Sequence, residues 1–61
     1  MPEVVIYLVE GRGKDMKKAL MKEITEAVVR NCSVPAEMVV VQIVESARDN
    51  KSRGGIPFSE R

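Results

Sequence analysis

The first two residues offer the most reactive candidate group in the chain. The sequence begins MPEVVIYLV, with Pro2 directly after the initiator methionine. Because the side chain of Pro2 is small, methionine aminopeptidase can remove Met1 and leave a free secondary amine. Such an amine acts as a general base once it is unprotonated, and burial or a nearby cation lowers its pKa. Pro2 is therefore a candidate catalytic base; the alternative is that proline is merely tolerated at the first position of a strand.

A second candidate follows the first apolar run. Arg12 lies in the turn EGRG, and its planar guanidinium suits bidentate binding of a carboxylate. A proline base beside such an arginine indicates proton transfer at the carbon next to the carbonyl of a small keto acid. The structural alternative for Arg12 is a solvated turn residue.

Three further cations lie near the C-terminus. They are Arg48, Lys51 and Arg53. Polar hairpins commonly carry exposed charges, so a purely solvated role is the more ordinary alternative for all three.

Other catalytic sets are missing from the sequence. There is no histidine, no phosphate-binding glycine loop and a single cysteine, Cys32, so the usual zinc ligand sets and the Cys–His pair cannot form. Cys32 lies at the end of a predicted helix, where the helix dipole does not activate a thiol, and packing is its expected role. We expect no metal and no cofactor.

The elements that must position these residues follow from the apolar pattern. Short runs of β-branched residues predict two buried strands, and a period of three to four residues predicts a helix between them. Strand, helix and strand in succession predict a β-α-β unit with parallel strands. Paired glycines predict a short hairpin near the C-terminus. The predicted ranges are Val4–Val9, Lys14 to about Asn31, Met38–Val44, and a final strand at Ile56–Phe58.

The predicted helix has an apolar side and a charged side. The neighbouring residues Lys17 and Lys18 are most simply part of its solvated face. The methionines Met16, Met21 and Met38 are expected to fill the core.

Length and composition predict one α+β domain, residues 1–61, that assembles with other copies. Of 61 residues 44% are hydrophobic, yet a chain this short buries only about 60% of its unfolded surface. A two-stranded sheet also leaves unpaired edges, which must pair or aggregate. The economical solution is a dimer in which two subunits form a four-stranded sheet with two helices, while the C-terminal hairpin reaches a neighbouring subunit.

Charge and hydropathy argue against two classes of partner. The formal net charge is +1, which gives no general reason to expect nucleic acid or an anionic membrane as a partner. No apolar run reaches transmembrane length and no signal-peptide pattern is present, so the expected location is cytoplasmic.

Six features follow one another along the chain: Met1-Pro2, the strand VVIYLV, the EGR turn, the long helix, the second valine-rich strand and GGIPFSER at 54–61. Taken together, they resemble the 4-oxalocrotonate tautomerase family. The resemblance covers essentially the whole chain. It implies a β-α-β tautomerase fold, four-stranded dimers, usually a hexamer built as a trimer of dimers, and a role in aromatic hydrocarbon catabolism. By position it makes Pro2 the base, exposed by removal of Met1, and Arg12 the residue that binds a carboxylate of a small enol or keto acid.

The chain departs from the family at two positions. The best-studied members carry a second arginine in strand two and an aromatic residue before the paired glycines, where this chain has Val40 and Lys51. Arg48, Lys51 or Arg53 could supply the missing positive charge from a different place, and Lys51 could also lower the pKa of Pro2. Either the substrate differs from 4-oxalocrotonate or activity toward it is poor. The predicted function is a tautomerase or isomerase of small enol or unsaturated 2-oxo acids. The alternatives are hydratase or dehalogenase chemistry on the same scaffold, or an oligomeric member without activity.

Overall fold

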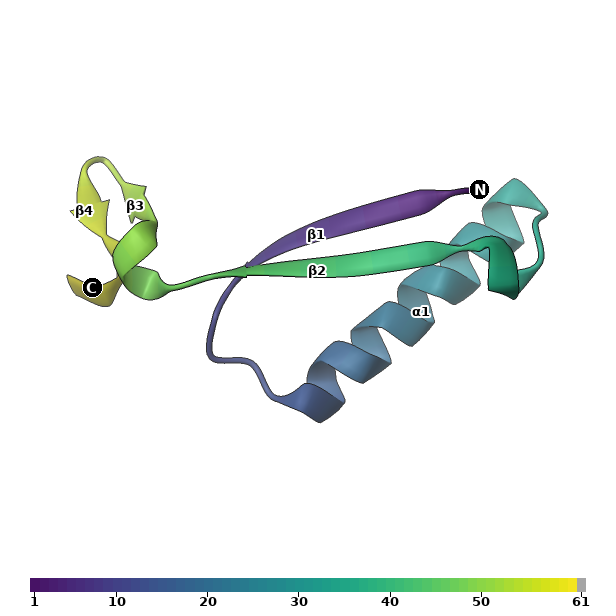
Figure 1. Ribbon diagram of the computed structural model, residues 1–61, viewed down its shortest axis with the longest axis horizontal. Helices are drawn as coiled ribbons and strands as arrows, with labels where there is room; N and C mark the ends of the chain where they lie inside the picture. Colours follow the sequence, from purple (N-terminus) through teal and green to yellow (C-terminus); the bar gives the residue numbers. More distant parts are fainter. Residues whose placement is uncertain (61) are drawn as a thin grey trace.

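The chain folds into a parallel two-stranded sheet with one long helix against it and a small hairpin at the far end (Figure 1). This computed structural model describes residues 1–60. The sheet pairs β1 with β2 in parallel, and the hairpin pairs β3 with β4 antiparallel. The elements are β1 (Glu3–Val9), α1 (Lys14–Cys32), β2 (Val40–Ser46), β3 (Ser52–Arg53) and β4 (Ile56–Pro57).

The connection between α1 and β2 explains the one large difference from the predicted strand boundaries. Ser33 ends the helix in the left-handed conformation, with φ 55°, and its amide donates to the carbonyl of Val29 over 3.0 Å. Pro35 then starts a 3-10 turn that closes with a 3.0 Å bond from the amide of Met38. Because this turn uses Met38, the predicted start of the strand there was wrong, and β2 instead runs from Val40 to Ser46.

The end of the chain differs in a similar way. The predicted strand Ile56–Phe58 is shorter than expected, because Phe58 begins a 3-10 turn, Phe58–Glu60. The amide of Phe58 donates to the carbonyl of Lys51 over 2.8 Å, and this bond closes the hairpin. Gly54 and Gly55, with φ of 61° and 81°, form the tight turn that the sequence predicts.

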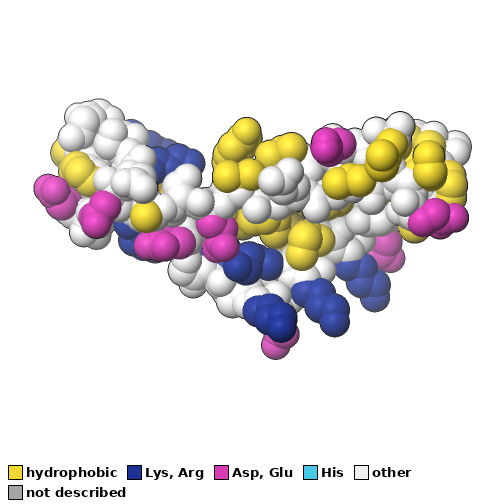
Figure 2. All heavy atoms as spheres, in the orientation of Figure 1, with side chains coloured by type: hydrophobic (Ala, Val, Ile, Leu, Met, Phe, Trp, Pro, Cys, Tyr) yellow, Lys and Arg dark blue, Asp and Glu magenta, His cyan; other side chains and the backbone are white. Residues whose placement is uncertain are grey.

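The sheet has one face toward α1 and one open face. Ile6 pairs with Ile43 on the helix side, and the neighbouring pair, Tyr7 and Val44, points the other way. On that open face Tyr7 is 69% exposed. A single chain therefore leaves one face of the two predicted strands uncovered. Figure 2 shows apolar side chains along the upper side of the molecule, over the strands, and basic ones along the helix below.

The chain is more extended than a stable monomer of its size. None of residues 1–60 is buried, and the expected core methionines Met16 and Met38 are exposed. The radius of gyration is 14.6 Å, whereas a compact domain of this length has roughly 10.5 Å. The accessible surface is 4735 Å², against about 4000 Å² for a folded monomer of this mass. A core that one chain leaves open in this way favours assembly with further copies.

Candidate active site

Pro2 lies immediately before β1 and is held in place by β2. Its carbonyl accepts a hydrogen bond of 2.9 Å from the amide of Val40, the first residue of β2. Pro2 itself is half-buried, whereas Met1 is exposed to solvent. An aminopeptidase can therefore reach Met1, and after its removal the nitrogen of Pro2 would remain at the end of a fixed strand.

Val40 is hydrogen-bonded to Pro2 through the backbone, at the start of the two strands. The register pairs Glu3 with Val40, so the hydrogen bond to Pro2 continues the β1–β2 ladder by one step. The side chain of Val40 is 40% exposed and carries no polar group. The position at which the family resemblance expects an arginine is thus hydrogen-bonded to Pro2 through the backbone, and its side chain is apolar.

Arg12 follows the end of β1, whereas Pro2 precedes its start, and Figure 1 shows the course of β1 between these two ends. The strand has seven residues, which at about 3.3 Å per residue makes it roughly 23 Å long. The turn after Val9 does not bring Arg12 back, because α1 starts at Lys14 at this same end. Within one chain the structure therefore does not bring Pro2 and Arg12 together.

The other three candidate cations lie at the Arg12 end as well. Since β1 and β2 are parallel, the segment after Ser46 starts where β1 ends. A guanidinium nitrogen (Nη2) of Arg48 would lie 3.9 Å from a Cβ atom added at Gly11, next to Arg12 in the chain. Lys51 is half-buried just before β3, and Arg53 is exposed within β3. The candidate base thus lies at one end of β1, and the candidate cations follow the other end of the strand.

The structure also assigns a partner that the sequence reading missed. Lys17 was placed on the solvated face of the helix, but its Nζ forms a 2.9 Å ion pair with Oε1 of Glu45 on β2. Lys17 lies three residues before Leu20 and seven before Ile24, on the side of α1 that faces the sheet. This spacing was the signal that could have identified it.

The structure also describes the cysteine, the side chains that could bind a metal ion, and the helices. Cys32 is an exposed free thiol at the end of α1, so it does not belong to a core. Within residues 1–60, no group of three or more histidine, cysteine, aspartate or glutamate side chains is placed to hold a metal ion. In the same range no helix is both long and apolar enough to cross a membrane.

Comparison with known proteins decides the family. The family model described as Tautomerase enzyme matches residues 2–61. The chain belongs to the 4-oxalocrotonate tautomerase family. A probable tautomerase of Bradyrhizobium diazoefficiens is 43% identical over 61 residues, which cover all of this chain and 91% of that protein. The 2-hydroxymuconate tautomerase of Pseudomonas putida is 37% identical over 60 residues, which cover 98% of this chain and 95% of that protein.

Solved structures of tautomerases have the same subunit fold. A crystal structure of a 4-oxalocrotonate tautomerase homologue superposes with a TM-score of 0.94 at 34% identity, over 100% of this chain and 97% of that one. A heterohexameric 4-oxalocrotonate tautomerase from Chloroflexus aurantiacus superposes with a TM-score of 0.90 at 28% identity, over 98% and 97%. The expected tautomerase fold is thereby confirmed, and its family supports an isomerase role for this chain.

Proposed function

We propose that this tautomerase moves a proton within small enol or unsaturated 2-oxo acids, with the free amine of Pro2 as the general base. In the enol-to-keto direction the neutral amine takes the hydroxyl proton. The C=O bond forms as the electron pair of the C=C bond shifts to carbon, and the resulting ammonium returns the proton to that carbon. The observation that carries this proposal is the position of Pro2, fixed at the start of β1 by the bond from Val40 within a chain that matches the family from residue 2 onward.

The active site is shared between chains in this proposal. Because Pro2 and Arg12 lie at opposite ends of β1, one small substrate can contact both residues only if Pro2 and Arg12 come from different copies of the chain. The open face of the sheet, which includes Val5, Tyr7 and Val40, gives the copies an apolar surface to bury. A homo-oligomer, expected to be a hexamer built as a trimer of dimers, is supported by the heterohexameric relative.

Arg12 binds the substrate carboxylate in this arrangement, through two parallel hydrogen bonds from its guanidinium. Arg48 lies close enough to Gly11 to add positive charge beside it, and Lys51 and Arg53 are carried by the same end of the chain. These three cations are the candidates to replace the arginine that Val40 does not supply. We place the enzyme in the cytoplasm and assign it no cofactor.

Val40 sets the substrate class that suits the site. The apolar side chain at position 40 cannot stabilise a second carboxylate. Burying an unpaired charge next to it costs free energy. An enol acid with an apolar substituent at that end fits better than a dicarboxylate. Phenylenolpyruvate is a substrate of this kind, and 2-hydroxymuconate is the dicarboxylate with which to compare it.

The test compares two versions of the protein, whose N-terminal state is established by intact mass. One form has lost Met1, and the other retains it because a bulky residue inserted after Met1 blocks the aminopeptidase. An amide nitrogen cannot accept the proton, so the retained form should lose about 10²- to 10⁴-fold in kcat/KM toward phenylenolpyruvate. Equal rates in both forms would contradict the proposal. A Pro35→Ala variant, which removes an exposed proline between α1 and β2, controls for general effects of substitution.

A further inference from the structure

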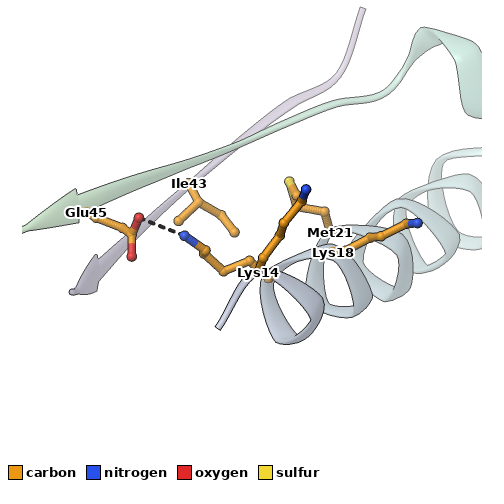
Figure 3. A pocket seen from close by; sticks show the side chains of 6 residues that line it. Lys14, Lys18, Met21, Ile43 and Glu45 are labelled. Carbon is orange, nitrogen blue, oxygen red and sulfur yellow. Dashed lines mark hydrogen bonds and ion pairs between the residues drawn. The ribbon is translucent and has the colours of Figure 1, made fainter. Parts of the chain in front are cut away.

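A cavity of about 390 Å³ opens between the first half of α1 and the end of β2. Figure 3 shows Glu45 and Ile43 extending from the strand and Lys14 and Met21 extending toward them from the helix, whereas Lys18 extends along the helix. The cavity has a charged rim and an apolar floor. Its lining residues are Lys14, Lys17, Lys18, Met21, Ile43 and Glu45.

The charges around this cavity do not cancel. Glu45 is the single acidic residue in its lining, and it is already paired with Lys17 at 2.9 Å. Lys14 and Lys18 are exposed, and neither forms an ion pair with any residue in the range 1–60. Two ammonium groups are therefore left to attract an anion at the mouth of the cavity.

The floor supplies the opposite character. Met21 and Ile43 are both half-buried and face the cavity from α1 and β2. A thioether and a branched aliphatic side chain accept an aromatic or alkyl group without requiring hydrogen bonds. A ligand that suits both parts of the cavity must combine an apolar body with a negative charge.

We propose that this cavity is a second binding site, which takes a small carboxylic acid with an aromatic or alkyl body. The carboxylate lies between the ammonium groups of Lys14 and Lys18, and the body lies against Met21 and Ile43. The volume falls in the range of roughly 300 to 1,000 Å³ found for small-molecule sites. Charge complementarity favours the acid over a neutral or cationic molecule of the same shape.

The cavity is distinct from the site around Pro2. Its strand residues, Ile43 and Glu45, lie on the helix side of the sheet, whereas Tyr7 and Val40 lie on the open face that we assign to other copies. It also lies at the end of β2 that is remote from Pro2. Contacts made through the open face do not cover the helix side of the sheet, where the cavity opens, and binding there does not depend on the proposed catalytic role.

The experiment titrates the full-length protein, in its native assembly, with 4-phenylbutyrate and follows the ¹³C-labelled methyl group of Met21 by NMR. A saturable shift of the Met21 signal is expected, with 4-phenylbutyramide binding at least about fivefold more weakly because it lacks the charge. The double variant Lys14→Gln/Lys18→Gln should lose a similar factor. Lys22→Gln, which removes an exposed lysine that does not line the cavity, is the matched control.

Other outcomes overturn the proposal. Equal binding of the acid and the amide, or unchanged affinity in the Lys14/Lys18 double variant, would show that the two ammonium groups hold no anion. No saturable shift at Met21 would show that the cavity takes no such ligand in the assembled protein. The Pro2→Ala variant should bind 4-phenylbutyrate as tightly as the unmodified chain, and lost binding there would place the ligand at the Pro2 site instead.

Discussion

The amide of Val40 donates a 2.9 Å hydrogen bond to the carbonyl of Pro2, which ties the start of β2 to the candidate base through the backbone. The two residues are 38 positions apart in the sequence, and only the parallel register of β1 and β2 brings them together. Under the proposed function, position 40 is the position at which the substrate selectivity is tested.

Substitution of Val40 by arginine should change this selection. A cation placed there offers a charge partner to a second carboxylate, so the ratio of kcat/KM for 2-hydroxymuconate to that for phenylenolpyruvate should rise by about tenfold or more. Steady-state kinetics with both substrates measure the ratio. Val40→Leu keeps the position apolar and should leave the ratio nearly unchanged; a similar rise in that variant would mean that size, not charge, controls selectivity.

The pH dependence of the reaction distinguishes a base from an acid at Pro2. A base must be unprotonated, so kcat/KM should decrease tenfold per pH unit below the pKa of the Pro2 amine and reach a plateau above it. A rate that instead decreases above that pKa would indicate that Pro2 acts as an acid, as the alternative hydratase chemistry requires. The measurement is a pH profile of kcat/KM with phenylenolpyruvate.

Loss of the Arg12 guanidinium should weaken substrate binding. Arg12→Ala is expected to lower kcat/KM by about 10- to 100-fold, because a charge-assisted contact to the carboxylate is lost. Arg12→Lys should recover only part of this loss, since an ammonium cannot form the bidentate pair. Arg30→Ala, which removes an exposed arginine in the last turn of α1, is the control, and an equal loss there would remove the specific role of Arg12.

The ion pair between Lys17 and Glu45 should contribute modestly to stability. Its side chains are 26% and 33% exposed, so Glu45→Gln should lower the free energy of unfolding by about 0.5 kcal/mol. Urea unfolding at one fixed protein concentration measures the change, and a double-mutant cycle with Lys17→Met isolates the pair. The coupling should decrease as salt is added. A coupling of zero at low salt would show that the pair does not contribute.

Local sequence patterns predicted the elements well because each is determined by near neighbours. The valine-rich runs give the two strands, the three-to-four spacing gives α1, and Gly54-Gly55 gives the hairpin turn. The start of β2 was misplaced because apolar Met38 continues the strand pattern, while Pro35 carries it into a 3-10 turn. Propensity alone does not show which of these two effects prevails.

The arrangement of the site could be predicted only in part. Pro2 and Arg12 were identified from residue type and from family resemblance, but their separation along β1 depends on the strand being straight and on α1 starting at the Arg12 end. The exposure of Tyr7 likewise depends on what covers the open face, which no local pattern specifies. The Lys17–Glu45 pair needs a contact between residues 28 positions apart.

The most direct test of the shared active site is a mixing experiment with Pro2→Ala and Arg12→Ala chains. Each variant alone should be nearly inactive toward phenylenolpyruvate. After unfolding and refolding together in equal amounts, half of the chains carry Pro2 and half carry Arg12, so about one quarter of the shared sites should hold both residues. The account predicts that the mixture recovers about a quarter of the unmodified activity. A mixture no more active than its two components would contradict it.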